Sequence, residues 1–418
     1  MKKRSIFTAV AAAGLIAFPA TASVYASPVD DGNLDHDHLQ EIFDDMAEAD
    51  VEAAVAEVRY GDEVWTDAFG NQSLEVPMEA EPTDRVRVAS ISKSMVGVIG
   101  LQLQAEGKLD LDDNVSDYLP DALPYDDDIT LRQLLNHSSG MSDHMNTYLY
   151  PDVFLGDWEL LEELKWQRFD PDDHIDIGTQ DDLQFDPGAN WAYSNTGYTV
   201  FGLVVEEVTG NDIADEFEQR VFEPAGMDAT YQPGLHEFIL RGQSLGAYFH
   251  TGDDEQPYVD TTIKSLSQLW TSGSVVSNPQ DVNAFYRSFA DGTLLNEEQY
   301  AEALEFPFEE DGVSYGLGVS GDYFGCPSLE EGIAIGHGGG GIGHESTSLH
   351  SLDGEKQITL TYNTNTALID EEGLQESIME LAIVALCGDD VSPNEVEQLA
   401  EELTEEALED EASVLNQH

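Results

Sequence analysis

Positively charged residues are scarce in this chain. Only 16 of its 418 residues are Lys or Arg, whereas 84 are Asp or Glu, and the formal net charge is −68. A field of this sign repels phosphate backbones and anionic headgroups, so we expect no nucleic-acid or membrane partner. Because 41% of the residues are hydrophobic, the composition excludes a disordered polyanion. We interpret the acidity as the surface of a halophilic globular protein, whose self-repulsion is screened by salt. An ordinary acidic protein is the alternative.

Long apolar runs are missing beyond the N-terminus. None reaches the roughly 18 residues that a membrane span needs, so we expect no membrane insertion. The N-terminus itself has a basic start, Lys2-Lys3-Arg4, followed by an apolar stretch over residues 6–18 and then small residues. This pattern is typical of a signal peptide, here over residues 1–26, and predicts a secreted protein, extracellular or periplasmic.

Cysteine occurs only twice, at Cys326 and Cys387. An even count in an oxidising compartment permits one disulfide, and two free buried thiols are the alternative. The segment Asp35-His36-Asp37-His38 contains metal-ligating residue types, but an acidic surface stretch is the simpler interpretation, so no metal is expected. His137 and His250 have no metal-like partners nearby in the sequence and are interpreted as structural.

The segment Ser90-Ile91-Ser92-Lys93 has the spacing of a nucleophile and its base. A serine hydroxyl is a weak nucleophile that needs a base beside it. Residues three apart share one face of a helix, so Lys93 would lie next to the hydroxyl of Ser90. Apolar residues on both sides allow Lys93 to be buried, and burial lowers the pKa of a lysine so that its amine can accept a proton. The alternative is a helix start with a serine cap and an exposed lysine.

A second segment, Tyr193-Ser194-Asn195, follows the turn signal Pro187-Gly188. The phenol of Tyr193 would transfer a proton to a leaving group, and the amide of Asn195 would hydrogen-bond a substrate amide. An aromatic-rich loop that packs on a core is the alternative.

A third segment, GHGGGGIG over residues 336–343, follows a short apolar strand. Glycines let a backbone approach a ligand closely. A phosphate-binding loop would also need a Lys-Ser/Thr pair and a following helix, and neither is present. The His-Gly-Gly-Gly oxyanion loop of α/β-hydrolases precedes a Gly-x-Ser-x-Gly elbow, which this chain lacks. Both of these alternatives fit poorly.

In this order, the pairs Ser90/Lys93, Tyr193/Asn195 and His337/Gly339 resemble the three catalytic elements of the serine β-lactamase-related family. That family includes class C β-lactamases, D-alanyl-D-alanine carboxypeptidases and β-lactamase-fold esterases. Further similar segments lie at residues 129–141, 198–210, 221–227 and 272–277. The resemblance runs roughly from Leu39 to Cys387.

The resemblance implies an α+β, penicillin-binding-protein-like fold of two lobes, in which an antiparallel sheet flanked by helices lies beside a mostly helical lobe. We expect a hydrolase domain over residues 27–390, with the helical lobe inserted at about 108–270. An acidic tail over residues 391–418 has weak helical periodicity and is interpreted as a solvated helix. The expected elements are a helix over 39–48, a hairpin over 51–70, a nucleophile helix from 86 to about 107, strands over 315–319, 333–336, 347–352 and 357–362, and a closing helix over 374–386.

The resemblance also implies catalytic roles. Ser90 would be the acylated nucleophile, Lys93 its base and Tyr193 a proton shuttle. His337 takes the place of a lysine in class C β-lactamases and is assigned a catalytic role with them.

Substrate binding would fall to Asn195, Gly339 and Gly340. The backbone amides of Ser90 and Gly340 would form an oxyanion hole, which stabilises charge that develops in the transition state. No cofactor is implied.

Two departures from the family pattern concern the substrate. Family members that bind a substrate carboxylate usually have Thr or Ser after the Lys/His, and this chain has Gly338. Where an aromatic often follows the last glycine, the chain has His344 and then Glu345. Both changes argue against carboxylate-terminated substrates.

We therefore predict a monomeric, secreted, salt-adapted serine hydrolase that acts through an acyl-enzyme on small-molecule or peptide substrates, namely esters or D-amino-acid amides and peptides. The alternatives are a β-lactamase or D-Ala-D-Ala carboxypeptidase, and a catalytically silent binding or regulatory protein on the same fold.

Overall fold

The computed structural model of the chain describes residues 34–47, 51–75, 77–126, 128–154, 156–251, 256–308, 314–365, 371–392, 395–401 and 403–404. The predicted signal peptide lies outside these residues. No helix within these ranges has both the length and the hydropathy that crossing a bilayer requires.

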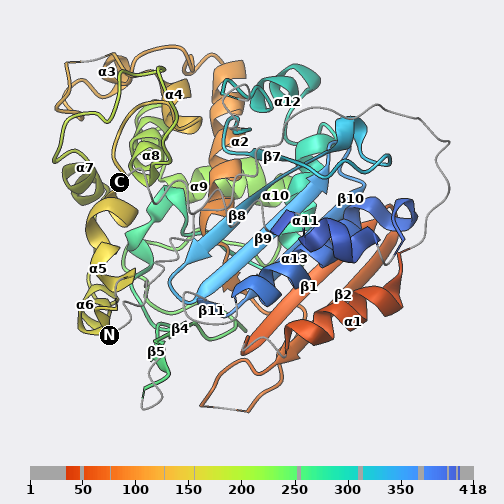
Figure 1. Cartoon of the computed structure of the whole chain (residues 1–418). Helices are drawn as coiled ribbons and strands as arrows, with labels where there is room; N and C mark the ends of the chain where they lie inside the picture. Colours follow the sequence, from red (N-terminus) through yellow and green to blue (C-terminus); the bar gives the residue numbers. More distant parts are fainter. Residues whose placement is uncertain are drawn as a thin grey trace, which may run out of the picture.

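The centre of the molecule is a six-stranded antiparallel sheet with strand order β2-β1-β10-β9-β8-β7 (Figure 1). Its strands are β1 (Ala53–Tyr60), β2 (Glu63–Gly70), β7 (Ser320–Tyr323), β8 (Ile333–Gly341), β9 (His344–Ser351) and β10 (Lys356–Tyr362). β1 pairs with β10 over residues 54–60 and 356–362, so the two ends of the chain build one sheet. The predicted α+β class and the predicted antiparallel sheet are confirmed.

Each face of the sheet is covered by helices. Alternate residues of a strand point to opposite faces, and β1 shows this directly. Ala54, Ala56 and Val58 pack with α1 (His36–Met46) and α13 (Glu371–Cys387). Ala53 and Val55 belong instead to the core that contains α2 (Ser92–Ala105) and α11 (Pro279–Ala290). Figure 1 shows α1 and α13 crossing the same face of the sheet.

A helical lobe follows α2, as expected. Its helices are α3 (Val115–Tyr118), α4 (Leu131–Leu135), α5 (Pro151–Phe154), α6 (Trp158–Leu164), α7 (Pro171–Gly178), α8 (Asn195–Thr209), α9 (Ile213–Phe217) and α10 (Glu223–Ala225), with π-helical turns η2 (His144–Leu149) and η3 (Glu218–Phe222). α8 begins at Asn195 because the Ser194 side chain accepts from the amide of Gly197, and it ends at Gly210 in the left-handed conformation (φ 73°).

Smaller elements complete the fold. They are β3 (Val86–Arg87), which pairs with β6 (Val276–Ser277), the sheet β11-β4-β5 of β4 (Tyr248–His250), β5 (Tyr258–Asp260) and β11 (Thr364–Asn365), the helix α12 (Glu297–Ala303), and the short 3₁₀ turns η1 (Ala89–Ile91), η4 (Leu266–Gln268), η5 (Trp270–Ser272), η7 (Glu330–Gly332) and η8 (Gly388–Asp390).

The prediction of a strand over residues 315–319 is wrong. Tyr315 forms only an isolated bridge to Ser320, where β7 begins. Gly318 has φ 84°, and a Cβ there would lie 2.4 Å from the carbonyl oxygen of Lys93. A Cβ at Gly316 would lie 2.1 Å from the carbonyl oxygen of Ala303. These glycines let the segment pack closely against its neighbours, and a left-handed residue interrupts a strand.

The N-terminal helix begins earlier than expected. Asp35 caps α1, because its carboxylate accepts a hydrogen bond from the amide of His38 at 3.0 Å. One of the two carboxylates of the Asp35–His38 segment, that of Asp35, is thus used in helix capping. Within the described residues, no group of three or more His, Cys, Asp or Glu side chains could hold a metal ion.

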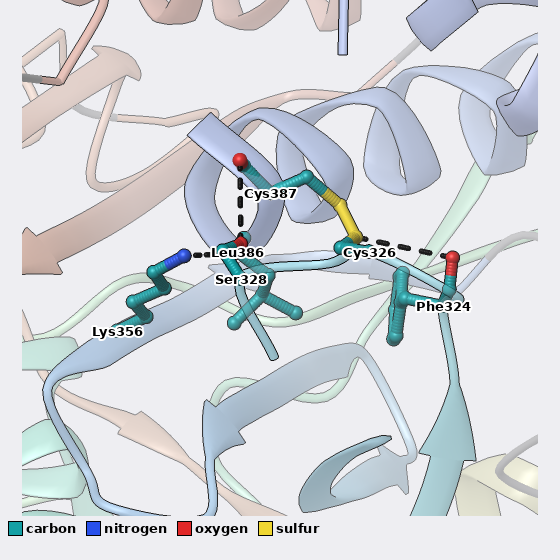
Figure 2. The surroundings of a disulfide bond; sticks show 6 residues. All are labelled: Phe324, Cys326, Ser328, Lys356, Leu386 and Cys387. Atoms are coloured by element: carbon teal, nitrogen blue, oxygen red, sulfur yellow. Dashed lines mark hydrogen bonds between the residues drawn. A yellow bond between two sulfur atoms is a disulfide. The ribbon is translucent and has the colours of Figure 1, made fainter. Parts of the chain in front are cut away.

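Cys326 and Cys387 form a disulfide, which settles the alternative left open by the sequence. Their Cα atoms are 5.4 Å apart and 61 residues apart in sequence, and the bond ties the segment before η7 to the end of α13 (Figure 2). The amine of Lys356 donates to the carbonyl of Leu386 at 2.9 Å beside it. In the acidic tail, residues 395–401 are helical, but Val396 and Leu403 are buried in the α13 core, so this part is not fully solvated.

Candidate active site

The three sequence segments meet at one cavity. Ser90 lies in η1, immediately before α2, and Tyr193 and Asn195 lie at the start of α8. Gly340 is near the end of β8. All four line a cavity that is partly open to solvent. The sheet and the helical lobe thus both contribute walls.

The hydroxyl of Ser90 is held by two of the predicted catalytic residues. The amine of Lys93 donates to Ser90 Oγ at 3.1 Å, and the phenol of Tyr193 donates to the same oxygen at 2.7 Å. Burial lowers the pKa of Lys93 to about 7, with a partial opposing effect of the Asp143 charge. Near neutral pH the amine is therefore partly unprotonated and can accept the serine proton. Burial raises the pKa of Tyr193 well above 10, so its phenol stays neutral and can donate.

The turn that carries Ser90 has an uncommon backbone conformation. Ala89 has φ 46°, a region that residues with a Cβ rarely adopt. Ser92 stabilises the turn, because its hydroxyl donates to the carbonyl of Ala89 at 2.7 Å and accepts from the amide of Val275 at 3.2 Å. Backbone of this kind is often found at functional sites, where the surrounding structure holds it in place.

Lys93 is fixed by two further acceptors. Its amine donates to Asn195 Oδ1 at 2.7 Å and to the carbonyl of Ser272 at 2.7 Å. The Tyr193 ring centroid lies 4.7 Å from the amine. In this structure Asn195, predicted as a substrate ligand, is therefore also a partner of the lysine.

Asp143 sets the orientation of Asn195, and the sequence analysis missed it. Its carboxylate accepts from the backbone amide of Asn195 at 3.1 Å and from the side-chain Nδ2 at 2.8 Å. Asn195 Oδ1 must then face Lys93. Asp143 also caps η2 and is only 4% exposed. Among 84 acidic residues, no local pattern marks the one that is buried beside the nucleophile.

His337 does not line the cavity within the described residues. It is buried, and its Nε2 is hydrogen-bonded to the hydroxyl of Tyr315 at 2.9 Å. Burial and the Lys93 charge lower its pKa to about 3, which keeps the ring neutral. Its catalytic role stays a prediction, because its side chain is hydrogen-bonded to Tyr315 and to the carbonyl of Gly338.

His137 supports the tyrosine from behind. Its ring centroid lies 4.3 Å from that of Tyr193 and 4.7 Å from that of Tyr315. Its Nδ1 accepts from the amide of Ser194 at 3.1 Å. His137 therefore has a structural role at the candidate active site, because its ring packs against that of Tyr193 and helps to position it.

The C-terminal half of β8 packs against the turn that carries Ser90. A Cβ at Gly339 would lie 2.2 Å from the carbonyl oxygen of Val88, so only glycine lets β8 pack against the Ser90 turn.

β7 pairs with β8 only up to Gly336, which leaves residues 337–341 without a β7 partner. Gly340 therefore lies on a stretch of strand edge beside Ser90. His344, by contrast, is wholly buried and accepts from the amide of Arg87 at 3.3 Å, so it faces the interior.

An antiparallel sheet and a helical lobe that bring a buried lysine and a tyrosine to one serine hydroxyl define a serine hydrolase. Residues 40–380 match the family model described as Beta-lactamase, and the chain belongs to this family.

Known proteins agree with this assignment. The chain is 25% identical to Penicillin-binding protein 4* of Bacillus subtilis over 363 residues, which cover 84% of this chain and 76% of that protein. The crystal structure of a D-stereospecific amidohydrolase from Streptomyces sp. matches with TM-score 0.72 and 29% identity, over 85% of this chain and 99% of that one. The octameric penicillin-binding protein homologue from Pyrococcus abyssi shares the fold, with TM-score 0.67 and 20% identity over 84% of this chain and 78% of that one. A monomeric state stays a prediction.

Proposed function

We propose that this protein hydrolyses esters or D-amino-acid amides and peptides through an acyl-enzyme on Ser90. The observation that carries the proposal is the position of Ser90 Oγ, which accepts hydrogen bonds from both Lys93 and Tyr193 at the wall of a solvent-accessible cavity. A catalytically silent protein would not need a buried lysine beside a serine, because such burial is unfavourable.

The reaction follows from the contacts. Unprotonated Lys93 takes the proton of Ser90 as Oγ attacks the carbonyl carbon of the substrate. The amides of Ser90 and Gly340 stabilise the resulting oxyanion. Tyr193 donates a proton to the leaving alcohol or amine, and its phenol is replenished from Lys93. Water then attacks the acyl-enzyme ester and releases the acid.

The walls of the cavity and the similarity to an amidohydrolase support the substrate class. Apolar side chains line much of the cavity, namely Met145, Tyr150, Phe154, Leu269 and Ile342. They suit an apolar acyl or amino-acid side chain. The edge of residues 337–341, which β7 does not cover, would suit an extended peptide or amide, which can add to it as a strand.

Secretion and salt adaptation belong to the same proposal. The N-terminal pattern supports export, and the Cys326–Cys387 disulfide is of a kind that persists in oxidising compartments. The net charge of −68 supports function in concentrated salt.

The test is a set of rates in about 1 M NaCl, where long-range charge effects are screened. p-Nitrophenyl butyrate, D-phenylalanine amide, a D-Ala-D-Ala peptide and a chromogenic cephalosporin are compared on wild type and Ser90→Ala. The control is Ser116→Ala, which removes an exposed hydroxyl on α3. We expect the ester or the D-amide to be cleaved fastest, and Ser90→Ala to lose both turnover and fluorophosphonate labelling. Full labelling of Ser90→Ala would refute the proposal.

A further inference from the structure

A second lysine lines the cavity that contains Ser90. Five lysines fall within the described residues, namely Lys93, Lys108, Lys165, Lys264 and Lys356. Lys264 follows β5, lines the cavity with Ser90 and Gly340, and is only 4% exposed. Lys93 is the base of the proposed reaction, and Lys264 has no role in it.

A buried arginine accompanies Lys264. Arg87 is 4% exposed, and its Nη2 donates to the carbonyls of Thr261 at 3.3 Å and Ile342 at 3.2 Å. Its Nε and Nη1 are buried without a hydrogen-bond partner among the described residues. Arg87 and Lys264 line a second, smaller cavity. The two cavities share Lys264, Leu269 and Gly341, so Lys264 stands where they meet.

No acidic residue balances these cations at the cavity walls. Among the described residues that line the two cavities there is no Asp or Glu, although the chain has 84 of them. The ion pairs among the described residues involve other cations, namely Arg59, Lys108, Arg132, Lys165, Arg168, Arg220 and Arg241. A buried cation without a partner is energetically unfavourable. Accordingly, burial and the Arg87 charge lower the pKa of Lys264 well below 10.5, and an anion bound beside the amine would oppose this shift and favour the protonated form.

We propose that Lys264, with Arg87 behind it, binds a carboxylate of the substrate, so that the preferred ester or amide carries a negative charge away from the bond that is broken. An anion there would restore the missing partner of Lys264 and would accept charge-assisted hydrogen bonds. The same pocket disfavours substrates that place an ammonium group in it. Because residue 338 is glycine, the hydroxyl that resembling proteins use for carboxylate recognition is missing beside His337. Lys264 would recognise the carboxylate at a different place in the cavity. This inference rests on the proposed hydrolytic function.

A matched pair of esters tests the inference. Mono-p-nitrophenyl glutarate and p-nitrophenyl valerate have acyl chains of equal length that end in a carboxylate or a methyl group. We compare the ratio of their kcat/KM values in wild type, Lys264→Met and Lys264→Arg, in about 1 M NaCl. Lys108→Met is the control, because it removes one positive charge from a residue whose side chain is 41% exposed.

We expect the glutarate-to-valerate ratio to fall about 10- to 100-fold in Lys264→Met, as for the loss of a hydrogen bond between charged groups. Lys264→Arg should keep most of the ratio, and Lys108→Met should keep all of it. The same ratio in Lys264→Met as in wild type would overturn the inference.

A binding measurement separates this inference from the hydrolytic function. Glutarate is titrated into Ser90→Ala and into Ser90→Ala with Lys264→Met, and Tm is followed at constant salt. A saturable rise in Tm that requires Lys264 supports the carboxylate site even if neither ester is cleaved, in which case only the hydrolytic function fails. If neither ester is cleaved and no rise depends on Lys264, the carboxylate site is refuted as well.

Discussion

The side-chain amide of Asn195 donates to the carboxylate of Asp143 across 2.8 Å. Because that contact uses the nitrogen end of the amide, the oxygen end is left to accept from Lys93 at 2.7 Å. Asp143 does not line the cavity, yet it determines which end of the Asn195 amide faces Lys93. Asp143 is a positioning residue in this arrangement.

Removing this carboxylate should alter the pH dependence of the reaction. The Asp143 charge raises the pKa of Lys93 against the larger effect of burial, so Asp143→Ala should lower that pKa further. Since the unprotonated amine is the active form, the acidic limb of the kcat/KM profile should move to lower pH, while kcat falls because Asn195 can rotate. Asp143→Glu should recover part of kcat. A profile that keeps its midpoint while activity drops would indicate a merely structural role.

Lys93 itself should set the acidic limb in wild type. Its pKa near 7 means that the amine is protonated in acid and cannot accept the Ser90 proton. The kcat/KM for a neutral ester should therefore rise through about pH 7 and level off above it. Lys93→Met should lose at least about 100-fold in kcat, the scale of a general base. Steady-state rates from pH 5 to 9 check both points, and a flat profile would exclude Lys93 as the base.

Gly338→Thr should change substrate preference rather than the chemistry. It places a hydroxyl next to His337 on β8, where Gly338 pairs with Thr347. We expect kcat/KM for a D-Ala-D-Ala peptide or a cephalosporin to improve relative to p-nitrophenyl butyrate. Gly338→Ala adds a Cβ without the hydroxyl and is the matched control. An equal effect of both variants on both substrate classes would show that the hydroxyl is not what limits carboxylate recognition.

Stability should depend steeply on salt. With a net charge of −68, repulsion acts over a Debye length of about 30 Å at 0.01 M salt but only about 3 Å at 1 M. Tm, followed by circular dichroism, should therefore rise strongly with NaCl or KCl. KM for an anionic substrate should fall with salt more than KM for a neutral ester, once the fraction folded is held constant. Equal stability at the two salt concentrations would refute the halophilic interpretation.

The disulfide should contribute measurably to stability. It closes a loop with a sequence separation of 61 residues, for which chain entropy predicts about 4 kcal/mol. Replacing both Cys326 and Cys387 by Ser should lower the free energy of unfolding by up to that amount, as measured by denaturant titration. Activity below the transition should persist, because the bond lies away from Ser90.

Local rules predicted the parts of the site that are close in sequence. The three-residue spacing placed Lys93 beside Ser90, and the turn at Tyr60-Gly61-Asp62 indicated the hairpin of β1 and β2. Local rules failed where long-range packing determines the backbone conformation or the burial of a residue. Gly316 and Gly318 lie in a segment that resembles a strand but packs against α2 and α12. Asp143 and Lys264 could not be recognised, because sequence alone does not show which charged residues are buried or which lack a partner.

The pairing of β1 with β10 joins early and late parts of the chain in one sheet. Ser90 and Lys93 are synthesised early and adjoin each other at once, whereas Gly340 reaches them only when β8 has been added to that sheet through β9 and β10. In the proposed mechanism, a growing chain therefore contains Ser90 and Lys93 before the amide of Gly340 can complete the oxyanion hole. Non-local strand pairing is slow compared with helix formation, so closure of the sheet, rather than formation of α2, determines when Ser90 of a newly made molecule can be acylated by a substrate.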